Sequence, residues 1–199
     1  LNVFYGYKTD GIVQTLEEGV EAGLDGDLAQ PGEFKYVDLN NDGTIDDNDR
    51  TIIGDPTPDF MASLNLSVNY KNFDASIFFN GVFGNDVLNT QAFNQPSNRP
   101  FRWTPDNPTN RYPSVRDGRQ TKMSDWWIED GSFVRIQNLT LGYKFGKPDK
   151  LSARVFMNAS NVFTFTKFKG YDPEVGTDGR YWGGYPRLRK WTLGLTLTL

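Results

Sequence analysis

Two chemically versatile side chains are absent from this 199-residue chain, which contains no cysteine and no histidine. Without cysteine there can be no disulfide, thiol nucleophile or thiolate metal ligand. Without histidine the chain lacks the commonest general base and metal ligand. Any catalysis would have to depend on carboxylates, lysine, tyrosine or hydroxyl groups, and we therefore expect that the protein is not an enzyme.

Long apolar runs and an excess of positive charge are also missing. No stretch approaches the roughly 18 to 20 apolar residues that a transmembrane helix needs, which excludes a helical membrane protein. The 21 basic and 25 acidic residues give a net charge of −4, so nucleic acid is not an expected partner. The first residues lack both the features of a signal peptide and an initiator Met, which predicts a mature or partial chain.

The sequence does contain several segments in which apolar and polar residues alternate, the pattern of a β-strand between two different environments. The clearest are residues 60–70, 73–83 and 190–199, and a two-residue turn at Lys71 and Asn72 aligns the apolar faces of the first two. Residues 133–145 alternate less cleanly, as a β-bulge near Gln137 would explain. Two further strands are expected at residues 153–165 and, more weakly, at residues 1–7.

The lengths of the connections favour a membrane barrel. Long connections, at about residues 14–59, 85–131 and 166–186, alternate with short ones. Compact soluble domains rarely repeat structureless loops longer than about 15 residues, whereas transmembrane barrels combine short periplasmic turns with long external loops. The expected fold is all-β: six or so antiparallel strands with long external loops. Because about 8 strands are needed to close the smallest membrane barrels, residues 1–199 are expected to be part of a larger one.

Aromatic residues at the ends of the apolar stripes agree with this interpretation, since aromatic girdles mark membrane interfaces. They are Tyr70, Phe73, Tyr143, Phe145 and Trp191. A soluble β-sandwich with one buried face is the alternative that the same alternation allows.

Five collinear segments resemble the C-terminal region of the SusC/RagA family of TonB-dependent outer-membrane transporters. They are "GYKTDGIVQT" (6–15), "PGEFKYVDLNNDGTIDDNDRTIIGDPTPDF" (31–60), "FFNGVFGNDVLN" (78–89), "SFVRIQNLTLGYKF" (132–145) and "NASNVFTFTKFKGYDPE" (158–174).

The resemblance implies a bacterial outer-membrane barrel of about 22 strands, plugged by an N-terminal domain. It implies import of glycans or peptides, with the rest of the barrel and the plug, a SusD-like surface lipoprotein, TonB and the lipid bilayer as partners. The chain departs from the family pattern in two respects. The plug and TonB-box segments are missing from it, and Leu199 stands where barrels usually end in an aromatic residue.

The stretch "YVDLNNDGTIDDNDR" (36–50) has the spacing of a calcium-binding loop of the EF-hand type. The candidate ligands are Asp38, Asn40, Asp42, Thr44, Asp46 and Asp49, with Gly43 at the sharp turn. The last position is Asp instead of the bidentate Glu, which is closer to a dockerin-like variant. A structural Ca²⁺ ion is one interpretation; the alternative is a loop whose side chains cap its own backbone in Asx-turns.

Aromatic residues in or beside the external loops are candidates for contact with a substrate or with the lipoprotein. They are Trp103, Trp126, Trp127, Tyr181 and Trp182. The alternative for these residues is packing inside the loops. Asp125, Glu129 and Asp130 could imitate a pair of catalytic carboxylates, but carboxylates this close together are common in acidic loops.

Three functional hypotheses remain after the sequence alone. The first is a segment of a SusC-like importer. The second is a structural or adhesive outer-membrane barrel without energy coupling, and the third is a soluble calcium-binding β-sandwich. A plug and TonB box upstream would separate the first from the second, and purification without detergent would support the third.

Overall fold

The computed structural model describes residues 3–93, 96–115, 121–146 and 151–198, which divide into two compact units. The loop unit comprises residues 1–57, 86–129 and 175–183, and the sheet unit comprises residues 58–85, 130–174 and 184–199. Among the described residues, no helix is both long and apolar enough to cross a lipid bilayer.

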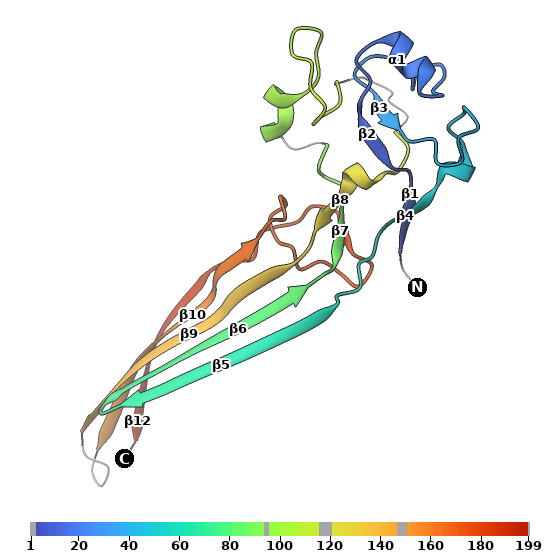
Figure 1. Cartoon of the computed structure of the whole chain (residues 1–199). Coiled ribbons are helices and arrows are strands. Elements are labelled where there is room, and N and C mark those ends of the chain that lie inside the picture. The colour runs from blue at the N-terminus through green and yellow to red at the C-terminus, as the bar shows by residue number, and fades with distance from the viewer. Residues whose placement is uncertain (1–2, 94–95, 116–120, 147–150, 199) are drawn as a thin grey trace. The chain divides into compact units, whose positions relative to one another are not determined.

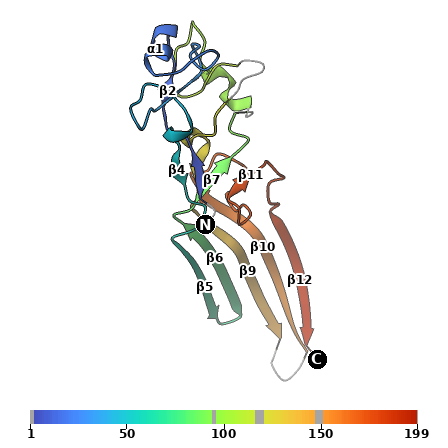
Figure 2. The same ribbon diagram turned by 90° about the vertical axis from the view of Figure 1, so that its right-hand side faces the viewer.

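The sheet unit is built on one sheet of five strands, drawn in Figure 1 as long, gently curved arrows. The strands are β5 (Phe60–Tyr70), β6 (Phe73–Phe83), β9 (Phe133–Gly146), β10 (Ser152–Thr166) and β12 (Lys190–Thr198). Their order is β5, β6, β9, β10, β12, and every pair of neighbours is antiparallel. Figure 2 shows the same five strands side by side, with the C-terminal end of β12 beside the ends of β9 and β10.

Two local predictions about this sheet are confirmed. Tyr70 pairs with Phe73 across the turn at Lys71 and Asn72, so the apolar faces of β5 and β6 coincide along their full length. The positive φ of Lys71, 54°, allows this tight reversal. Gln137 is the extra residue of a bulge in β9, because Asn138 pairs with Phe78 while Ile136 pairs with Phe79.

The prediction for residues 1–7 is corrected. The described part of this segment forms β1 (Phe4–Gly6), which pairs with β4 (Thr51–Gly54) in the loop unit and does not join the long sheet. Phe4 and Tyr7 are buried while Tyr5 is half exposed, so the side chains do not follow the expected single apolar face. Within the described ranges the long sheet therefore has five strands.

The loop unit is made of short elements around a small core. Besides β1 and β4 it contains β2 (Thr9–Ile12), α1 (Leu16–Glu21), β3 (Phe34–Tyr36), η1 (Asp47–Asp49), β7 (Asp86–Asn89), η2 (Pro96–Phe101), η3 (Asp125–Trp127), most of β8 (Ile128–Asp130) and β11 (Arg180–Tyr181). Thr15 caps the N-terminus of α1, because its side chain accepts a hydrogen bond from the N–H of Glu18. The core consists of Tyr7, Ile12, Val13, Leu24, Ala29, Phe34 and Tyr36.

Candidate functional site

One face of the long sheet is apolar from edge to edge. The strand register places Leu66, Ile77, Leu139, Ala159 and Trp191 in one row across all five strands. The next row contains Val68, Ala75, Leu141, Met157 and Leu193. Most of these side chains are exposed, and Leu193 reaches 78%. An apolar surface this large requires an apolar environment, which water does not provide.

Aromatic pairs lie at both ends of this apolar face. At the end nearest the β5–β6 turn, the rings of Phe73 and Tyr143 are 4.6 Å apart. At the opposite end, the rings of Phe60 and Phe83 stack at 4.5 Å. The 11 residues of β5 extend about 33 Å, or about 23 Å along the membrane normal if tilted by about 45°. This height matches the apolar band of a membrane barrel, about 25 Å.

The opposite face of the sheet carries polar side chains that are hydrogen-bonded across strands. One row contains Ser67, Ser76, Thr140, Asn158 and Thr192. Asn158 donates a hydrogen bond from Nδ2 to the hydroxyl of Thr140 at 3.0 Å. The hydroxyl of Ser160 donates to Oδ1 of Asn138, also at 3.0 Å. Such a face suits contact with water or with another polar protein surface.

An ion pair crosses the polar face over the middle strand. Arg154 on β10 donates from Nε and Nη2 to the two carboxylate oxygens of Asp74 on β6, at 2.9 Å and 2.5 Å. Gly142 of β9 pairs with Asp74, whereas Arg154 pairs with Lys144, two residues further along β9. A Cβ atom on Gly142 would come within 2.6 Å of both partners, so glycine is needed there for the pair to form. This bidentate pair locks three strands together.

A second charge network contains a buried arginine on the same face. Arg135 of β9 donates at 2.6 Å to each of Asp172 and Glu174, and its Nε donates to the hydroxyl of Thr164. Arg187 binds the other oxygen of each carboxylate at 3.1 Å. Each carboxylate is therefore shared between two arginines, and the network attaches two segments of the β10–β12 connection to the sheet.

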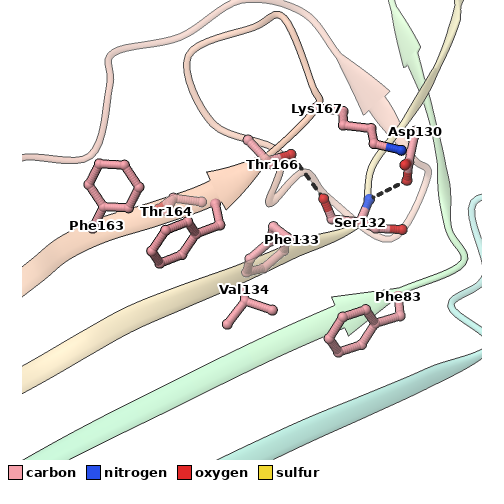
Figure 3. Close-up of a pocket in the computed structure, with 10 residues that line it drawn as sticks. Phe83, Asp130, Ser132, Phe133, Val134, Phe163, Thr164, Thr166 and Lys167 are labelled. Carbon is pink, nitrogen blue, oxygen red and sulfur yellow. Dashed lines mark hydrogen bonds between the residues drawn. The ribbon is translucent and has the colours of Figure 1, made fainter.

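A hollow of about 630 Å³ lies at one end of the sheet, where β6, β9 and β10 terminate. Figure 3 shows Phe83, Phe133 and Phe163 in its walls. Its rim is fixed by hydrogen bonds from Thr166 Oγ1 to the carbonyl of Ser132 and from Ser132 N–H to Asp130 Oδ1, both 2.9 Å. Four phenylalanines and Val134 offer apolar packing, and Asp130 and Lys167 are the charged residues of the lining.

The predicted calcium loop lies in the loop unit, and its carboxylates bind the loop's own backbone. Asp38 Oδ1 accepts from the N–H of Asn41 at 2.6 Å, and its Oδ2 accepts from the N–H of Gly43 at 2.7 Å. Asp42 Oδ1 accepts from both the N–H and the hydroxyl of Thr44. Within the described ranges, no group of three or more Asp or Glu side chains is arranged to hold a metal ion.

Asp49 differs from the other candidate ligands because it is fully buried. Its two oxygens accept hydrogen bonds from the N–H groups of Leu39, Asn40 and Asp46. Burial acts to raise the pKa of Asp49, but these backbone donors outweigh it and the pKa is lowered. Asp46 in turn caps η1 by accepting from the N–H of Asn48. This geometry is that of the Asx-turn alternative, and calcium binding stays a prediction.

Most of the candidate aromatic residues pack within the loop unit. The indole N–H of Trp126 donates to the carbonyl of Arg111 at 2.9 Å, and its ring lies 5.1 Å from that of Phe34. The indole N–H of Trp103 donates to Gln14 Oε1 at 2.8 Å.

Trp127 and Tyr181 complete this packing, while one candidate remains accessible. The ring of Trp127 lies 5.0 Å from that of Trp126, and Tyr181 is buried. Trp182 is 63% exposed, so among these five it is the best placed for contact with a ligand.

The acidic trio near residue 127 does not form a catalytic pair. Asp125 Oδ1 accepts from the N–H and hydroxyl of Thr9, and Glu129 Oε1 accepts from Nδ2 of Asn89. Asp130 binds the N–H of Ser132. Each carboxylate has its own structural partner.

Sequence reasoning missed both charge networks. Alternation places Asp74 and Arg154 on the polar face, but only the register across three strands shows that they meet. Arg135 lies upstream of the bulge, where the alternation is disturbed. In the sequence, Asp172 and Glu174 stand out only as the end of residues 158–174, one of the five segments that carry the family resemblance.

No family model matches the chain. It is 35% identical to TonB-dependent receptor P3 of Formosa agariphila, over 98% of the chain and 22% of that receptor. It is 34% identical to TonB-dependent receptor SusC of Bacteroides thetaiotaomicron, over 84% of the chain and 18% of SusC. The chain thus spans about a fifth of the length of these relatives.

Solved structures agree with the fold. The RagAB peptide transporter aligns with 98% of this chain at a TM-score of 0.77 and 22% identity, over 22% of its own chain. The closed-closed state of the RagAB peptide importer aligns with a TM-score of 0.71.

The two-faced sheet and these structural neighbours define a segment of a large β-barrel of the outer-membrane type. The chain belongs to the TonB-dependent receptors of the SusC/RagA family. Its relatives are receptors and transporters, which fits the expectation that it is not an enzyme.

Proposed function

We propose that this chain forms part of the wall of a TonB-dependent outer-membrane importer of glycans or peptides, which works with a SusD-like surface lipoprotein and draws energy through TonB. The observation that carries the proposal is the sheet with one apolar and one polar face, continuous in register over five strands. The apolar face meets lipid and the polar face lines the lumen.

The similarity to SusC and to RagAB supports the nutrient classes named here. RagAB is described as a peptide transporter, whereas the 34% identical relative carries the name SusC. Peptides and glycans are both rich in hydrogen-bonding groups, and the serine, threonine and asparagine rows of the polar face can contact either class.

The orientation of the sheet can be tested with a pair of adjacent cysteines, after any cysteine outside residues 1–199 of the receptor has been replaced, since residues 1–199 contain none. Thr192→Cys on the polar face and Leu193→Cys on the apolar face are introduced separately into the intact receptor in outer membranes. A water-soluble maleimide is expected to label Thr192→Cys and to leave Leu193→Cys unlabelled until detergent is added. Equal labelling of both would contradict the assigned faces.

Transport itself is tested with cells that express the intact receptor and its lipoprotein. Labelled oligosaccharides and labelled oligopeptides are offered in parallel, and uptake is expected for one of the two classes. Deletion of TonB is expected to abolish that uptake while leaving the amount of receptor in the membrane unchanged. Uptake of neither class, or uptake that persists without TonB, would refute the proposal.

A further inference from the structure

The charge network around Arg135 is asymmetric. Arg135 is almost fully buried, with 3% of its side chain exposed, and its contacts with Asp172 and Glu174 measure 2.6 Å. Arg187 is 45% exposed and binds the same carboxylates at 3.1 Å. Water and salt weaken ion pairs at exposed sites much more than at buried ones. The Arg135 contacts are therefore the stable half of the network, and the Arg187 contacts are the half that can release.

Arg187 lies on a segment with few other attachments. Residues 184–189, called the strap below, have no regular secondary structure, and each of them is exposed. Besides the Arg187 contacts, a hydrogen bond of 3.1 Å ties the carbonyl of Leu188 to Nδ2 of Asn161 on β10. The strap begins directly after Gly183, whose φ of 82° is a conformation that favours glycine. A short exposed segment that follows Gly183 and begins with Gly184 can move without disturbing the sheet.

The strap lines a hollow of about 340 Å³ with Pro186, Arg187 and Arg189. The rest of the lining comes from the sheet and its connection and includes Arg135 and Thr164. Release of Arg187 would move one wall of this hollow away and leave Asp172 and Glu174 attached to Arg135.

We propose that residues 184–189 form a movable strap over this hollow, with Arg187 as its catch and Arg135 as the fixed anchor of Asp172 and Glu174. The inference rests on the proposed function in one respect, namely that the polar face lines the path of the substrate. Opening the strap widens that path at the sheet surface, and closing it narrows the path. The device is local, since the strap, its anchor and the strands all belong to the sheet unit.

Distances between spin labels in the intact receptor test the strap directly. One label is placed at Leu188→Cys in the strap and the other at Met61→Cys on β5, two exposed positions. Arg187→Gln removes the catch, and Arg189→Gln is the matched control because it removes the same charge from the same segment. The parent and the control are expected to give one main distance, and Arg187→Gln is expected to add a second, longer population.

Salt provides an independent arm of the experiment. Raising the salt from about 0.1 M to about 1 M shortens the Debye length from about 10 Å to about 3 Å. The parent is expected to shift toward the longer population, whereas Arg187→Gln changes little because its catch is already gone. Identical distributions for Arg187→Gln and Arg189→Gln at both salt concentrations would overturn the strap.

Uptake measured on the same variants separates the strap from the proposed function. If the parent takes up a nutrient, Arg187→Gln is expected to change the uptake rate. An unchanged rate with Arg187→Gln would overturn the role of the strap in transport. A parent that shows no uptake but a salt-dependent distance would refute the importer and retain the moving strap.

Discussion

The two units of this chain place similar side chains in opposite environments. In the loop unit Phe34, Ile12 and Val13 are at most 1% exposed and lie in its core. In the sheet unit Leu66, Val68 and Leu193 are 51% to 78% exposed on a continuous face. The loop unit is thus folded for water, whereas the sheet requires lipid on one side. The difference shows that the surrounding solvent, and not composition, decides where the apolar side chains lie.

The largest expected effect comes from the core of the loop unit. Phe34→Ala removes a ring that is 1% exposed and contacts Tyr36 and Trp126. A substitution of this kind costs about 3 to 5 kcal/mol of stability. Limited proteolysis of the assembled receptor is expected to cut the loop unit and leave the sheet strands intact. Simultaneous loss of both units would contradict their independence.

The next effect concerns the lipid-facing side of the sheet. Leu66→Arg in the middle of β5 places a charge on the apolar face, which costs about 2 to 4 kcal/mol near the bilayer midplane. The neighbouring Asn65→Arg points to the polar face and is expected to cost much less. Unfolding by urea in lipid vesicles measures the free energy of unfolding of both variants. Similar losses for Leu66→Arg and Asn65→Arg would contradict the assignment of the apolar face to lipid and of the polar face to the lumen.

A smaller effect is expected at the buried carboxylate of the loop unit. Asp49→Ala leaves the N–H groups of Leu39, Asn40 and Asp46 without their acceptor, although all three are bonded in the parent. An unsatisfied buried group costs about 1 to 3 kcal/mol. Hydrogen exchange of these three amides is expected to accelerate. Protection equal to that of the parent would show that the carboxylate does not hold the loop.

The calcium prediction is sharpened by the exposed carboxylates of the same loop. Asp38→Ala combined with Asp42→Ala removes two expected ligands and also two acceptors of backbone N–H groups. If Ca²⁺ binds, the parent resists protease better in calcium than in chelator, and the double variant loses that difference. If the loop works only through Asx-turns, chelator has no effect on the parent and the double variant is cut faster in both conditions.

The smallest effect is expected from pH at α1. The N–H of Gln14 binds the carboxylate of Glu18, and together with Lys35 it holds the pKa of Glu18 below its usual value despite partial burial. When the pKa of a carboxylate is lower in the folded state than in the unfolded state, the carboxylate stabilises the folded state. This stabilisation is complete above the pKa of the unfolded state, about 4.5 for Glu, and is lost as the pH falls through the pKa of the folded state. Amides of α1 are expected to lose protection as the pH falls below about 4.5. Glu18→Gln, which cannot titrate, should lack this step.

Much of the sheet could be predicted from the sequence, because apolar and polar residues alternate with a period of two in a strand that lies between two environments. Residues 60–70 and 73–83 match β5 and β6 at both ends, and the bulge at Gln137 was visible as a slip in the alternation. Residues 1–7 were misassigned because a short alternating run does not specify its partner strand. Trp126 could not be assigned either, since the ring of Phe34 that it contacts is 92 positions away along the chain.

The two faces of the strands, the turn at Lys71 and Asn72, and the family can be predicted from the order of the residues, since each depends on neighbouring residues or on collinear segments. The folded chain was needed to show that Asp74 meets Arg154 over Gly142, and that Arg135 and Arg187 share Asp172 and Glu174. These contacts depend on the register between strands and on how a connection returns to the sheet. Both are set by long-range pairing, which leaves no periodic trace in the order of the residues.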